Sequence, residues 1–129
     1  YGPASRQYGG THPESEPETA ALTALCRRVP FRHAMALHSQ GQEIYWEYGP
    51  RTPPKARLMA GVMAASSGYL AAQPEGLASH GGFKDWFIEE FGRPAFTVEL
   101  GRGQNPLPAA DLLPIYERVE EMLLLTTLM

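Results

Sequence analysis

Two short apolar segments of this chain each end in a residue that can take part in chemistry. Residues 31–38 lead through Ala, Met, Ala and Leu to His38, and residues 95–100 carry Glu99 within Phe-Thr-Val-Glu-Leu. Segments that are apolar on both faces are typical of strands buried in the middle of a sheet. Because α/β sheets bind ligands at the carboxyl ends of their strands, His38 and Glu99 are predicted to lie together there.

The remaining segments alternate between helical patterns and loops. A first helix is expected to begin at a capping box formed by Ser15 and Glu18 and to stop at Pro30. Later in the chain we predict helices over residues 55–67, 83–91 and 109–128, a further strand over residues 44–48, and loops over residues 69–82 and 101–106. Helices that alternate with isolated strands predict an α/β sandwich.

Composition narrows the class of protein. A length of 129 residues fits one domain, 1–129, and 43% hydrophobic against 19% charged residues excludes a disordered tail. The net charge of −3 predicts no nucleic-acid partner, and Cys26 has no second cysteine with which to form an internal disulfide. The longest apolar stretch, residues 122–129, is far shorter than the roughly 20 residues that cross a bilayer, so no membrane partner is expected. The compartment is left open.

Four motifs, in order along the chain, carry a resemblance to a known family. They are Ser-Glu-Pro-Glu at a helix start, Leu-His-Ser after a buried strand, Gly-Gly-Phe-Lys-Asp-Trp opening a helix, and Phe-Thr-Val-Glu-Leu as the last strand. With them the chain resembles the zinc carboxypeptidase family, and most closely its bacterial branch that cuts γ-D-glutamyl-diamino acid bonds in cell-wall peptides. The resemblance implies a three-layer α/β/α sandwich with a mixed, mostly parallel sheet.

The resemblance also implies a metal and a base. His38 corresponds to the third zinc ligand and Glu99 to the general base, while the His-x-x-Glu pair that provides the other ligands and the Asn-Arg pair that binds the terminal carboxylate are absent. We therefore expect the chain to be the carboxyl-terminal half of such an enzyme, inactive alone and with zinc absent or weakly bound. Half of a central sheet exposes a strand edge, through which we expect self-association or partner binding.

The same resemblance suggests which residues contact a peptide substrate. Lys84 falls where the family lines the pocket for the residue beyond the cut bond, so its ammonium would favour a carboxylate there, such as that of diaminopimelate. A direct count places Leu77 where the family has its catalytic tyrosine. If the loop differs in length, His80, which immediately precedes Gly81-Gly82, or alternatively Tyr69, would replace that tyrosine, and Gly82 is also expected to contact the substrate.

Each of these residues also has an ordinary structural interpretation. Lys84 could be an exposed helix lysine, His38 a core histidine and Glu99 a solvated strand end. Arg102 could cap the pocket or belong to a common polar loop, as could Gln104 and Asn105. Two other functions also fit the sequence, namely a peptide-binding module that has lost its metal, and a zinc-dependent deacylase of a small amino acid.

Overall fold

The structure is a computed structural model that describes residues 10–73 and 81–129. Contacts within the chain divide it into two compact units, Tyr1–Phe31 and Arg32–Met129, and each is described by itself. Within the described residues no helix is both long and apolar enough to cross a membrane.

The described part of the first unit, residues 10–31, contains one helix, α1 (Pro17–Arg28), with a proline in its first turn. Its N-cap is Glu16 and no side chain caps it, because Ser15 lies one position too early and its hydroxyl donates to Glu16 instead. The predicted capping box is therefore wrong, while the end of the helix before Pro30 is as expected. Cys26 is buried, which raises the pKa of its thiol and agrees with a structural role.

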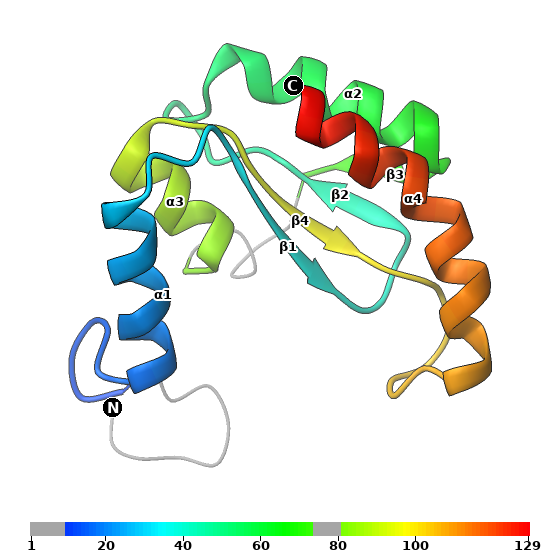
Figure 1. Ribbon diagram of the computed structural model, residues 1–129, viewed down its shortest axis with the longest axis horizontal. Helices are drawn as coiled ribbons and strands as arrows, with labels where there is room; N and C mark the ends of the chain where they lie inside the picture. Colours follow the sequence, from blue (N-terminus) through cyan, green and yellow to red (C-terminus); the bar gives the residue numbers. More distant parts are fainter. Residues whose placement is uncertain (1–9, 74–80) are drawn as a thin grey trace. The chain divides into compact units, whose positions relative to one another are not determined.

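The second unit is built on a four-stranded sheet. In the order β1-β4-β2-β3, the outer pairs β1–β4 and β2–β3 run parallel and the central pair β2–β4 runs antiparallel. The strands are β1 (Ala34–His38), β2 (Glu43–Tyr45), β3 (Leu70–Ala72) and β4 (Ala95–Glu99). Figure 1 shows β4 between β1 and β2. The sheet is therefore mixed and mostly parallel, as predicted.

Helices cover both faces of this sheet. Helices α2 (Pro54–Ser67) and α4 (Leu112–Leu128), the latter preceded by a 3₁₀ turn (Ala109–Asp111), bury their methionines against one face. The core between them and the sheet consists of Ile44, Met59, Ala60, Met63, Tyr69, Phe96, Val98, Val119 and Met122. Helix α3 (Phe83–Phe91) contacts β4 and β1 and buries Phe87 and Ile88. These layers make the α/β/α sandwich that the family resemblance implies.

The glycines after α2 and α3 end these helices as the sequence indicates. Gly68 and Gly92 have φ values of 70° and 60°, a left-handed conformation that side chains disfavour, and each N–H bonds to the carbonyl four residues earlier.

Three details of the predicted sheet are wrong. The strand expected over residues 31–38 begins only at Ala34, and β1 is an outer strand of this sheet, with the Leu37 side chain half exposed. The strand expected over residues 44–48 ends at Tyr45. Part of the expected loop over 69–82 is β3, whose three residues Leu-Ala-Ala are too few to show alternation. A strand this short is defined by its hydrogen bonds to the neighbouring strand, and the local pattern of residue types does not reveal it.

Candidate functional site

The site begins with three polar residues in a row across the sheet. His38 of β1 pairs in register with Glu99 of β4, and Glu99 pairs on its other side with Glu43 of β2. Side chains at directly opposite positions of neighbouring strands leave the same face. The imidazole and the carboxylate are therefore neighbours, as the sequence predicted.

Hydrogen bonds between the loops that follow these strands hold the row in place. The Asn105 amide donates to the Ser39 carbonyl at 2.9 Å, and the Ser39 hydroxyl donates back to Asn105 at 3.1 Å. The Gly103 N–H donates to the Gln40 side chain at 3.1 Å, and the Leu100 N–H donates to the His38 carbonyl at 2.8 Å. The loop after β4 thus supports the backbone beside His38.

A pocket of about 210 Å³ opens beside this row. His38, Glu99, Tyr45 and Thr97 contribute from the strands, and residues at the start of α3 complete the wall; these are Gly82, Phe83, Lys84 and Asp85. This volume is below the roughly 300 Å³ at which pockets for drug-sized ligands begin. The pocket is therefore suited to a single amino-acid side chain.

Lys84 lies inside the protein, with only 3% of the residue exposed. Its ammonium bonds to Asp85, donates to the Glu47 carbonyl at 2.7 Å, and lies 5.8 Å from the centre of the Tyr48 ring. The interpretation of Lys84 as an exposed helix lysine is therefore wrong. These contacts hold the Lys84 side chain in place in the pocket wall, beside Asp85.

Tyr45 and Asp85 are site residues that the sequence did not single out. The Tyr45 hydroxyl donates to Glu43 at 2.5 Å, which holds the phenol ring along the strand beside Glu99. Alternation of Glu43 and Tyr45 along β2 is the signal that could have placed both on one face. The sequence offers one signal for Asp85, which is its position directly after Lys84 in the motif Gly-Gly-Phe-Lys-Asp-Trp that opens the helix.

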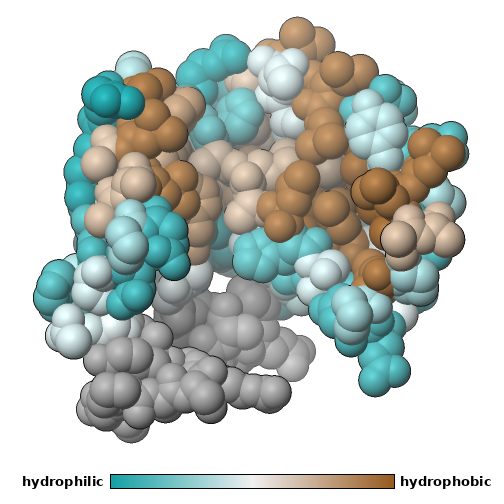
Figure 2. Space-filling view, turned by 60° about the horizontal axis from the view of Figure 1, so that its bottom comes forward, coloured by the Kyte–Doolittle hydropathy of each residue, from teal (hydrophilic) through white to brown (hydrophobic). Residues whose placement is uncertain are grey.

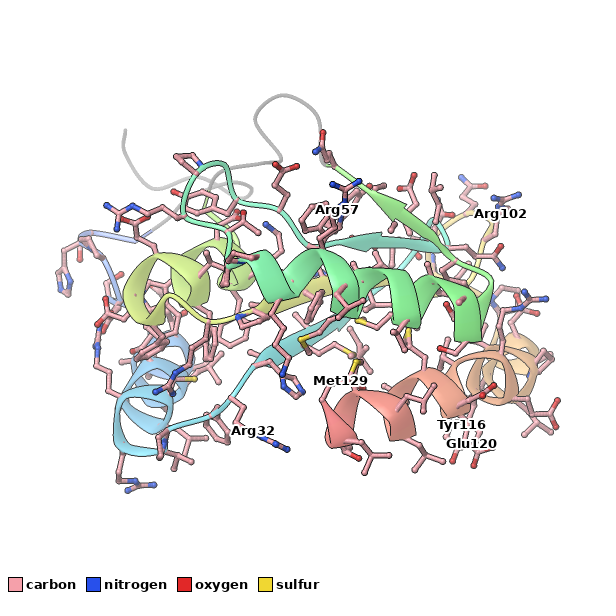
Figure 3. All side chains as sticks on the ribbon, turned by 90° about the horizontal axis from the view of Figure 1, so that it is seen from above. Arg32, Arg57, Arg102, Tyr116, Glu120 and Met129 are labelled. Carbon is pink, nitrogen blue, oxygen red and sulfur yellow. The ribbon has the colours of Figure 1, made fainter. Side chains whose placement is uncertain are left out.

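The other predicted substrate residues are placed differently. Gly82 lines the pocket, whereas Arg102 lines a separate depression with Asp111 and Arg118, and Figure 3 shows it on the loop beyond β4. Tyr69 is buried in the core, where its hydroxyl accepts from the Gly101 N–H at 3.1 Å, so it does not reach the pocket. His80 and Leu77 lie outside the described residues.

The described residues do not complete a zinc site. Across residues 10–73 and 81–129, no three His, Cys, Asp or Glu side chains gather to hold a metal ion. Catalytic zinc normally takes three protein ligands, and here His38 is the imidazole at the site. His33 is half-buried, and this burial, with the charges of Arg32 and Lys55, lowers its pKa. At this site the described residues therefore bring together the exposed imidazole of His38 and the carboxylate of Glu99.

Comparison with known proteins gives a consistent result. A family model described as zinc carboxypeptidase matches residues 1–122. The chain is 42% identical over 115 residues to γ-D-glutamyl-L-diamino acid endopeptidase 1 of Lysinibacillus sphaericus, covering 89% of this chain and 28% of that protein. It is 36% identical over 121 residues to the uncharacterized protein YqgT of Bacillus subtilis (strain 168), covering 94% of this chain and 32% of that protein. The chain thus spans about a third of the length of these relatives.

Solved structures agree with the sequence comparison. Bovine thrombin-activatable fibrinolysis inhibitor, in complex with tick carboxypeptidase inhibitor, matches with a TM-score of 0.68 and 25% identity, covering 90% of this chain and 46% of that one. A second structure of thrombin-activatable fibrinolysis inhibitor matches with a TM-score of 0.67 and 26% identity, covering 90% of this chain and 34% of the other.

Proposed function

The chain belongs to the zinc carboxypeptidase family, and from this premise we propose that it provides the general base and one metal ligand of a peptidase that cuts γ-D-glutamyl-diamino acid bonds in cell-wall peptides. The observation that carries the proposal is the register pair of His38 and Glu99 beside a pocket with Lys84 in its wall. The name of the Lysinibacillus relative supports the choice of bond.

Each residue then has a definite task. Glu99 accepts a proton from the attacking water and later donates it to the nitrogen of the leaving amine, which is general acid–base catalysis by one carboxylate. His38 would bind the metal through an imidazole nitrogen, and bound zinc would polarise the scissile carbonyl and lower the pKa of its water. Lys84 attracts a carboxylate on the residue beyond the cut bond.

A peptide-binding module without catalysis is the second candidate. One observation favours it, because within the described part of the chain the pocket is formed while three metal ligands are not. Binding of a diaminopimelate peptide that Lys84→Glu abolishes, that Glu99→Gln leaves unchanged and that never leads to hydrolysis would favour this candidate.

The isolated chain provides the first test of catalysis. We expect no stoichiometric tight binding in a zinc titration by calorimetry, and no turnover of a γ-D-glutamyl-diaminopimelate peptide, because the sequence contains no His-x-x-Glu pair to join His38 as ligands. Tight binding of one zinc together with turnover would contradict the proposed division of the site.

A chimera tests the roles of the residues. This chain would replace its matching region in the Lysinibacillus relative, and the chimera is expected to hydrolyse the peptide. Glu99→Gln should lower kcat by about 10²–10⁴-fold while zinc content stays unchanged, whereas His38→Ala should lower zinc content. Glu89→Gln, in an exposed ion pair with Arg51, is the control and should change neither. Full activity of the Glu99→Gln chimera would refute the role of Glu99.

A further inference from the structure

The pocket wall carries two buried charges of opposite sign. Lys84 and Asp85 are each 3% exposed, they bond to one another, and both line the pocket. A buried ion pair contributes little to stability, since desolvation of the charges offsets their attraction. Its position in a pocket wall therefore points to recognition of a ligand.

Both partners keep unused hydrogen-bonding capacity. Among the described residues, two of the three Lys84 ammonium hydrogens have acceptors, at Asp85 and at the Glu47 carbonyl, which leaves one donor. Asp85 accepts from Lys84 at one oxygen and from the Gly82 N–H, at 3.3 Å, at the other. Since each carboxylate oxygen has two lone pairs, both can accept once more.

A ligand that carries only one charge matches this wall poorly. The pair is already neutral as a whole. A lone carboxylate beside Lys84 would therefore leave an excess negative charge next to Asp85, and a lone ammonium beside Asp85 would leave an excess positive charge next to Lys84. A ligand group that carries an ammonium and a carboxylate on the same carbon can place the carboxylate beside Lys84 and the ammonium beside Asp85. The site then stays neutral.

We propose that Lys84 and Asp85 together recognise an α-amino acid zwitterion, the carboxylate facing Lys84 and the ammonium facing Asp85. This rests on the proposed function and makes it more specific, because the far end of a diaminopimelate side chain is such a zwitterion. The pocket would thereby distinguish diaminopimelate from both lysine and a simple dicarboxylic amino acid. Tyr45 and Thr97, which pair across the sheet, line the same pocket as this wall and Glu99.

Three ligands of matched length test the proposal on the 129-residue chain. They are the Nα-acetyl 1-amides of meso-diaminopimelate, L-2-aminopimelate and L-lysine, in which only the far end remains charged. The far end carries both charges in the diaminopimelate compound, only the carboxylate in the aminopimelate compound, and only the ammonium in the lysine compound. We expect calorimetry or NMR titration to show the diaminopimelate compound binding at least about tenfold more tightly than either of the others.

Variants connect this preference to the two residues. Asp85→Asn should remove the advantage of the diaminopimelate compound over the aminopimelate compound. Lys84→Met combined with Asp85→Leu replaces the pair with apolar side chains of similar size, so the fold is expected to persist, as judged by circular dichroism, while the preference disappears. Glu89→Gln, exposed on the same helix, should leave all three affinities unchanged.

The outcomes separate this inference from the proposed function. Equal affinity for the diaminopimelate and aminopimelate compounds would overturn the role of Asp85 and leave the carboxylate site at Lys84 in place. A preference that survives in the folded double variant would also overturn it. If no compound binds, the zwitterion site is wrong, while hydrolysis by the chimera still decides the proposed function separately.

Discussion

At the scale of single residues, Asp85 shows how one carboxylate can serve a helix and a pocket together. It lies in the first turn of α3, where negative charge is favoured by the helix dipole, and it accepts from the N-cap N–H of Gly82. Side chains of successive helical residues normally diverge. The long stem of Lys84 lets its ammonium reach Asp85 all the same, so the helix start positions both charges in the pocket wall.

Tyr69 should prove to be a structural residue. Tyr69→Phe removes the acceptor of the buried Gly101 N–H, and an unsatisfied buried N–H costs about 1–3 kcal/mol. We therefore expect a lower free energy of unfolding in urea titrations, and no change in affinity for the diaminopimelate compound. Loss of ligand binding in a variant of unchanged stability would show instead that Tyr69 contacts the substrate.

At the scale of elements, α1 is held by a side-chain network rather than by a cap. Glu14 accepts two hydrogen bonds from Arg27, at 2.9 and 2.6 Å, and one from Thr23 at 3.0 Å. These contacts tie Glu14, two residues before the N-cap, to Thr23 within the helix and to Arg27 in its last turn. A bidentate arginine–carboxylate pair also has a defined geometry, which an isolated surface charge lacks.

This network predicts a dependence of the stability of α1 on pH. The hydrogen bonds from Arg27, with Thr23 in support, lower the pKa of Glu14 from its usual 4.5. The stabilisation is therefore complete above pH 4.5 and is lost as the pH falls through the lower pKa of the folded state. The protection factors of the α1 amides, which account for the slower intrinsic exchange at lower pH, should therefore fall in that range. Glu14→Gln should remove this pH dependence, and an unchanged profile in that variant would refute it.

At the scale of the second unit, apolar side chains are exposed on several described elements, among them β3 at Leu70 and α2 at Leu58. Two further surfaces are candidates for association. One is the outer edge of β1, where Leu37 is 50% exposed. The other lies on α4, where Leu112, Leu113, Leu124 and Leu128 are exposed, and Figure 2 shows hydrophobic residues gathered on the side where Figure 1 places α4. An unpaired strand edge also presents free backbone groups, and β1, with five residues against three in the other outer strand β3, is the better site for self-association.

Two matched variants test self-association through β1. Light scattering at rising concentration should show oligomers of the isolated chain, and Leu37→Lys should raise the concentration at which they form by about tenfold, because charge on an edge strand opposes pairing. Leu128→Lys, on α4, should have a smaller effect. The edge is not the site if Leu128→Lys alone disperses the oligomers, or if the unmodified chain stays monomeric.

The sequence by itself determined the helices, their glycine ends, the α/β class, and the pairing of His38 with Glu99. These follow from local periodicity, from backbone preferences, and from the rule that parallel strands end together. Only the tertiary structure decided that β1 is an outer strand, that β3 exists, that Tyr69 belongs to the core, and that Lys84 is buried against Asp85. Each of these depends on which distant segment packs beside a residue, and the local pattern of residue types does not contain that information.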